Sequence, residues 1–163
     1  MSEGRATFTR EGDQAQAVME RLIEHPPEKV WAALTDPAVL PLWLAAGSIE
    51  LRPGGAARLD FGDSGVVIDS EVSDFAPDRV LEYSWSSPGE PERPLRWSLE
   101  PIDGWTELVL TLRQPVTEDI GRSCAGWEAH LEMLAAALEG VPIKFPFERF
   151  KAARDAYRAL LAD

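Results

Sequence analysis

The chain has 163 residues, a length at which one hydrophobic core is expected and folding buries about 70% of the unfolded surface. Hydrophobic residues make up 45% of the chain and charged residues 27%, which excludes disordered, collagen-like and disulfide-stapled proteins. The net charge of −12 argues against nucleic acid and anionic membrane surfaces as partners, because like charges repel.

The first part of the chain predicts one strand followed by two short helices. Residues 1–15 are polar and lack a sustained period, so we expect a flexible N-terminus or a weak strand. The segment Gln16–His25 has the length of a strand and ends at a pair of prolines. Residues 27–36 and 37–44 then carry apolar residues at helical spacing, the second beginning with Asp36 as an N-cap.

After Gly47 the hydrophobic period falls from about 3.6 to about 2 residues and turn residues become frequent, which predicts an antiparallel meander. Large apolar residues occupy one face of the later strands and charged residues the other, so one face of the sheet must be covered. The expected strands are Ser48–Leu51, Ala56–Phe61, Val66–Phe75, Val80–Ser86, Pro94–Pro101 and Thr106–Gln114.

The strongest helical pattern runs from Thr117 to Gly140. Acidic residues occupy its first turn, Gly140 provides a C-cap, and apolar residues recur every three or four positions. We expect this helix to cover the sheet. The segment Val141–Phe147 is broken by prolines, and Phe147–Leu161 resumes helical spacing, so a last helix should dock on the body or on a partner.

These elements predict one body in three segments. Residues 1–15 form the terminal segment, residues 16–140 the main domain, and residues 141–163 a helical extension docked on the same domain. No stretch approaches the roughly 20 apolar residues of a membrane span, and the first residues lack the apolar core of a signal peptide. We therefore expect a cytoplasmic protein without membrane insertion.

The sequence carries no catalytic or nucleotide-binding signature of the GxSxG, GxxxxGK[ST], GxGxxG or EF-hand type. Cys124 is the only cysteine, which excludes an intramolecular disulfide and a thiolate zinc cluster. Its place on the apolar stripe favours a structural role. His130 lies beside that stripe, where a histidine bonded to backbone or water is more common than one that transfers protons. We expect no catalytic residue, metal or cofactor.

Six tryptophans are the unusual feature of the composition. Five of them fall on faces predicted to point inward, and only Trp105 lies beside a turn. A curved sheet crossed by one helix is difficult to fill completely, so aromatic side chains are expected to line the remaining cavity. The predicted ligand-binding residues are Trp43, Trp85, Trp97, Leu110, Trp127, Leu131 and Leu134.

Four blocks within residues 16–140 carry a resemblance to a known family. They are PEKVWAALTDP at residues 27–37, Trp43-Leu44, PDRVLEYSW at residues 77–85, and Gly126-Trp127 with Leu131, Leu134 and Leu138-Glu139-Gly140. With the order of the elements, they resemble the START-like or SRPBCC superfamily. More closely, they resemble the branch named after the activator of the ninety-kilodalton heat-shock chaperone's ATPase.

The resemblance implies an α+β helix-grip fold, in which about seven antiparallel strands curve around the long C-terminal helix. It also implies an elongated apolar pocket between the sheet and that helix. Members of the superfamily bind lipids, sterols, hormones or polyketides there, and some catalyse cyclisation or hydrolysis. No catalytic motif of those enzymes matches this chain.

Three hypotheses about function stay open. The preferred one is a binding protein for a small apolar or amphipathic ligand, held between the sheet and the helix. The second is a cyclase- or hydrolase-like enzyme for a small aromatic or polyketide-like substrate, in which His130 or a pocket carboxylate moves protons. The third is an interaction protein whose acidic surface or 141–161 segment contacts a chaperone or a second copy, as a homodimer.

Overall fold

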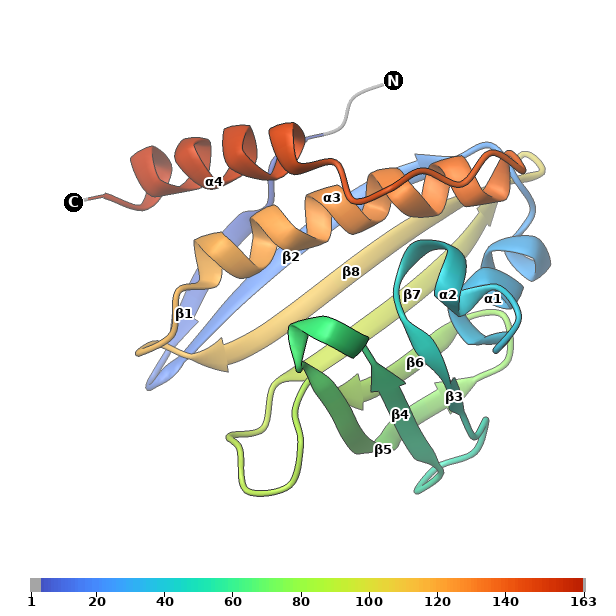
Figure 1. Ribbon diagram of the computed structural model, residues 1–163, viewed down its shortest axis with the longest axis horizontal. Helices are drawn as coiled ribbons and strands as arrows, with labels where there is room; N and C mark the ends of the chain where they lie inside the picture. The colour runs from blue at the N-terminus through green and yellow to red at the C-terminus, as the bar shows by residue number, and fades with distance from the viewer. Residues whose placement is uncertain (1–3, 163) are drawn as a thin grey trace.

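The computed structural model describes residues 4–162, and a curved antiparallel sheet grips one long helix in it (Figure 1). The sheet has eight strands in the order β1-β2-β8-β7-β6-β5-β4-β3. The strands are β1 (Thr7–Glu11), β2 (Gln14–Ile23), β3 (Ala46–Ile49), β4 (Ala56–Asp60), β5 (Val67–Ala76), β6 (Val80–Ser84), β7 (Pro94–Ile102) and β8 (Trp105–Pro115). The helices are α1 (Pro27–Thr35), α2 (Leu40–Trp43), the short 3₁₀ helix η1 (Gly62–Ser64), α3 (Ile120–Leu138) and α4 (Phe147–Leu161).

This is the α+β helix-grip architecture, so the predicted fold class is confirmed. The sheet has one strand more than the resemblance implies, because residues 7–11 pair with β2 as its edge strand. Residues 1–3 of the predicted terminal segment lie outside the described residues. The extension beyond residue 140 packs along α3 through α4 (Figure 1).

The second predicted helix is shorter than the sequence pattern suggests. The Asp36 carboxylate accepts a hydrogen bond from the Ala38 amide at 2.9 Å, which forms a turn where the helix was expected to begin. The helix α2 begins only at Leu40, whose carbonyl accepts from the Leu44 amide. The apolar face survives this change, since Leu40 and Trp43 are both buried.

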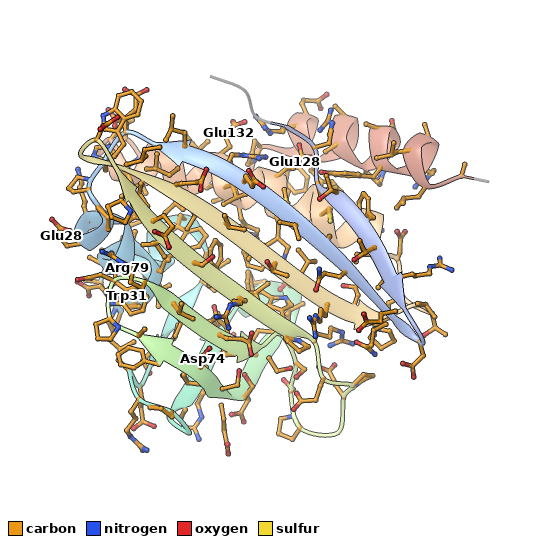
Figure 2. The ribbon with its side chains drawn as sticks, turned by 180° about the vertical axis from the view of Figure 1, so that it is seen from behind. Glu28, Trp31, Asp74, Arg79, Glu128 and Glu132 are labelled. Atoms are coloured by element: carbon orange, nitrogen blue, oxygen red, sulfur yellow. The ribbon has the colours of Figure 1, made fainter. Side chains whose placement is uncertain are left out.

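The two faces of the sheet differ as their alternation predicts. The outer face carries charged pairs, among them Arg96, which donates to Asp74 at 2.9 Å and to Glu82 at 3.3 Å (Asp74 is labelled in Figure 2). The hydrogen bond from Arg96 lowers the pKa of Asp74. These groups are exposed or half-buried, so they keep this face wetted and contribute little to stability.

Aromatic side chains fill the interior between the sheet and the helices. Trp43 and Trp97 are 1% exposed and meet edge to face, with ring centroids 5.9 Å apart. The indole nitrogen of Trp43 donates to the Ala33 carbonyl at 2.7 Å, so its polar atom is paired. Burial also raises the pKa of Tyr83, which lies in the same core. The interior around Trp43, Trp97 and Tyr83 is therefore packed.

A buried polar network joins α3 to α4 and to the N-terminal segment. The Glu128 side chain is 1% exposed and accepts from Arg5 at 2.6 Å and from the Tyr157 hydroxyl. The Tyr157 hydroxyl in turn accepts from the Ala6 amide at 2.9 Å. Figure 2 shows Glu128 on the side of α3 next to α4. Gly121 allows this close packing, because a Cβ there would lie 3.1 Å from the Tyr157 Cβ.

Candidate functional site

A partly open pocket of about 780 Å³ lies where α3 begins. The turn from η1 into β5 forms one side, and the loop of residues 85–93 and the end of β8 form the next two. The first half of α3 and Phe150 of α4 complete it. The volume falls within the roughly 300–1,000 Å³ of typical small-molecule sites. The sheet and the start of α3 thus leave room between them for a small molecule.

One wall of the pocket is aromatic. The rings of Trp85 and Trp127 meet edge to face with centroids 4.8 Å apart, and Phe61 packs on Trp85 at 5.9 Å. Trp127 also contacts Trp97 at 5.6 Å, which connects the pocket wall to the packed core. Each ring is held by another ring, so the wall is preorganised for flat apolar surfaces.

Gly126 opens the helical side of the pocket. It lies in the middle of α3 and lines the cavity, one residue before Trp127. A Cβ built on it would meet no atom of any other element within 4 Å. A glycine inside a helix costs about 1 kcal/mol relative to alanine. No other element of the described chain packs closely against Gly126 to offset this cost, and the space beside it is part of the pocket.

Arg93 fixes the loop of residues 85–93 to the start of α3. Its guanidinium donates two hydrogen bonds to the Glu118 carboxylate, at 2.9 and 2.8 Å, and a third to the Trp85 carbonyl at 3.2 Å. The hydrogen bonds from Arg93 lower the pKa of Glu118, and those from Glu118 raise the pKa of Arg93. Glu118 is thus an ionised, engaged group and a poor candidate for a proton acceptor.

His130 is the titratable side chain on the aromatic wall. Its Nδ1 lies 2.9 Å from the Trp43 carbonyl oxygen, which can only accept, so Nδ1 carries the proton. Burial lowers the pKa of His130, while the bond to Trp43 opposes that shift. Three rings surround the imidazole, those of Phe61, Trp127 and Phe145, at 6.1, 5.8 and 5.3 Å. The imidazole is therefore neutral at pH 7.

The protonation state of His130 can be measured directly, because the chain has only two histidines. We expect its imidazole to titrate with a midpoint below the ordinary value of 6.5 and to carry its proton on Nδ1 at pH 7. Two-bond ¹H–¹⁵N NMR spectra over pH 5–8 report both properties, and the signal is assigned by its loss in His130→Asn. A midpoint above 6.5, or a proton on Nε2, would contradict this assignment.

The structure brings only two of the seven predicted ligand residues to the pocket, Trp85 and Trp127. The other five are buried in the core and do not line it, because α2 packs against α3 and places the Trp43 ring on Trp97. They are Trp43, Trp97, Leu110, Leu131 and Leu134.

Sequence reasoning missed Phe61, Val66, Val67 and Gly126 as pocket residues. Only Gly126 carried a local signal, since a glycine within a strong helical pattern marks either a close approach or an open space. His130 was singled out as a histidine bonded to backbone or water, and the structure shows the bond to backbone, at the Trp43 carbonyl.

Two further observations concern residues 4–162. No cluster of three or more His, Cys, Asp or Glu side chains in this range is arranged to hold a metal ion. No helix in the same range is both long and apolar enough to cross a bilayer.

Burial raises the pKa of Cys124 to about 12, so its thiol stays protonated and packs as a small apolar group.

Comparison with protein families gives a match over most of the chain. The model of the family described as "Activator of Hsp90 ATPase homolog 1-like protein" matches residues 24–139, which is more than half of the chain. The resemblance drawn from residues 27–37, 77–85 and 126–140 is thereby confirmed. None of the curated proteins searched is similar to the chain.

Solved structures share the fold over nearly the whole chain. CalU16 from Micromonospora echinospora superposes with a TM-score of 0.81 at 22% identity, covering 98% of each chain. EF2215 from Enterococcus faecalis has a TM-score of 0.78 at 24% identity, covering 96% of this chain and 90% of its own. DynU16, from the dynemicin biosynthetic locus, has a TM-score of 0.70 at 30% identity and covers 78% of this chain but 48% of its own.

Proposed function

Because this chain belongs to the family of Activator of Hsp90 ATPase homolog 1-like proteins, we propose that it binds a small apolar or amphipathic molecule at the start of α3. The observation that carries this proposal is the pocket of about 780 Å³ with a preorganised aromatic wall. Aromatic rings that border open space gain no stability from the contacts they lack there. Binding of a ligand explains the open space better than a purely structural role of these rings does.

Three features support a ligand with a flat apolar body. The edge-to-face pair of Trp85 and Trp127 offers ring surface, and the lining residues Val66 and Val67 are almost half exposed. Charged lining residues are paired with each other, as in the ion pair of Arg93 with Glu118. One structural relative, DynU16, comes from a biosynthetic locus, which fits a small-molecule ligand.

Gly126→Leu is the sharpest test, because a Cβ at this position meets no atom of any other described element within 4 Å and the rest of the side chain would extend into the pocket. A panel of naphthalene derivatives, fatty acids and sterols is titrated while tryptophan fluorescence is followed, since Trp85 and Trp127 line the pocket. We expect saturable binding to the unmodified protein and at least about 10-fold weaker binding to Gly126→Leu. The variant should fold at least as stably, since leucine favours helix over glycine.

Ala135→Leu is the matched control, because it adds the same side chain on the exposed side of the same helix. It should bind the panel with unchanged affinity. A flat fluorescence response of the unmodified protein across the panel, or equal binding by Gly126→Leu, would overturn the proposal.

The two alternative functions have less support. An enzyme would need a second group to work with His130, and Glu118, a carboxylate that lines the pocket, is held by Arg93. A chaperone partner rests on the family's name. Co-purification with the ninety-kilodalton chaperone and sizing chromatography test that contact and a homodimer, respectively.

A further inference from the structure

We infer that the pocket selects planar aromatic molecules bearing a hydrogen-bond donor, such as a phenolic hydroxyl, which is donated to Nε2 of His130. This inference rests on the proposed function and specifies the ligand class of that site. It follows from the position of the imidazole on the aromatic wall and from the way in which its other nitrogen is used.

The bond to the backbone determines what His130 can offer. The N–H at Nδ1 donates a hydrogen bond to the Trp43 carbonyl. The neutral ring therefore has a lone pair at Nε2, which can accept a hydrogen bond. No partner of Nε2 occurs among residues 4–162, and the atom is not sealed from solvent. A ligand group at this position must therefore donate. A ketone, an ether or a carboxylate would place two acceptors against each other.

The surroundings of the ring keep it in this state. Phe61, Trp127 and Phe145 pack around it, and none of these three side chains donates a hydrogen bond to Nε2. A donor on a flat molecule stacked against Trp127 would thus meet Nε2 in a setting with little water, where hydrogen bonds discriminate strongly.

The charged side chains that line the pocket already have contacts of their own. Arg93, Glu90 and Glu118 form one ion-pair group, and Asp119 caps α3 by accepting from the Arg122 amide at 3.0 Å. The guanidinium of Arg122 lies over the Phe150 ring, and that of Arg113 donates to Gln16 at 2.8 Å. On the aromatic wall, His130 therefore offers an acceptor to a bound molecule, whereas the indole N–H groups of Trp85 and Trp127 can only donate.

Three probes of one shape separate this inference from simple apolar binding. They are 2-naphthol, naphthalene and 2-methoxynaphthalene, and only the first carries a donor. We expect the unmodified protein to bind 2-naphthol about 10-fold more tightly than either of the others, because they leave a desolvated acceptor unpaired. Apolar area alone predicts the opposite order for the methoxy compound, which buries an additional methyl group.

His130→Asn tests the role of the residue itself. The asparagine amide nitrogen can replace Nδ1 as donor to the Trp43 carbonyl, while Nε2 is lost. The ratio of the affinities for 2-naphthol and naphthalene should fall from about 10-fold to about 1-fold. His25→Asn is the control, because His25 lies away from the pocket, pairs with Glu139, and should leave the preference intact.

A readout on the unmodified protein makes the test independent of folding of the variant. The ¹⁵N resonance of His130 Nε2 should shift when 2-naphthol is added and stay in place with 2-methoxynaphthalene. Equal affinity for all three probes, no response of Nε2, or a preference that survives in His130→Asn would overturn the inference and leave the proposed function standing. Absence of binding by any probe, or by the wider panel, would instead contradict the proposed function.

Discussion

Trp97→Ala is expected to lower the free energy of unfolding by about 3–5 kcal/mol, the range for removing a large aromatic side chain from a packed core. Trp97 is 1% exposed and contacts the rings of Trp43 and Trp127, at 5.9 and 5.6 Å. It lies on β7, in the middle of the sheet, so its neighbours cannot collapse into the space without bending several strands. The loss therefore includes a cavity as well as the apolar contacts.

Urea unfolding followed by circular dichroism measures this change, with Trp105→Ala as the matched control. Trp105 begins β8 and is 41% exposed, so its loss should change stability by no more than about 0.5 kcal/mol. A loss below about 1 kcal/mol for Trp97→Ala would mean that the interior is loosely filled. The ligand site first expected around Trp97 would then regain support.

The strands and the long helix could be predicted because their apolar residues repeat with a clear period. Leu95, Trp97 and Leu99 alternate on one face of β7, and all three are buried as predicted. The α3 stripe is confirmed in the same way, from Cys124 to Leu138. Periodicity assigns a side chain to a face, and that suffices for a fold in which each element has one covered face.

Periodicity could not locate the pocket, because side chains on the same inward face can border either packed core or an open cavity. Trp85 and Trp97 both alternate inward, yet only Trp85 borders the pocket. The difference depends on what lies above each ring. Trp97 contacts Trp43 of α2, whereas Trp85 follows the end of β6 and contacts Phe61 and Trp127, which line the pocket with it. What packs on each ring therefore depends on residues that are distant from it in the sequence.

The state of His130 illustrates the same limit. Its place beside the apolar stripe predicted a hydrogen bond to backbone or water, but not which nitrogen would make it. The Trp43 carbonyl becomes available because α2 ends there, 87 positions earlier in the chain. The acceptor inferred at Nε2 is thus a property of the tertiary structure.

Tyr157→Phe is expected to lower the free energy of unfolding by about 3 kcal/mol, because one hydroxyl satisfies two buried groups. It donates to the Glu128 carboxylate and accepts from the Ala6 amide. A bond to a charged acceptor contributes about 1.5–3 kcal/mol, and an orphaned buried amide costs about 1–3 kcal/mol. Phenylalanine keeps the ring contact with Phe8, so the change isolates the hydroxyl.

The effect should be concentrated in α4, which is held to the body mainly through α3. Hydrogen exchange of the α4 amides should accelerate in Tyr157→Phe well before that of β8, whose amides lie inside the sheet. Arg158→Ala is the control on the same helix. Its side chain is 69% exposed and pairs only with Asp155 among the described residues, so exchange should stay unchanged. Uniform acceleration across α4 and β8 would show that the network stabilises the whole domain and not the docking of this helix.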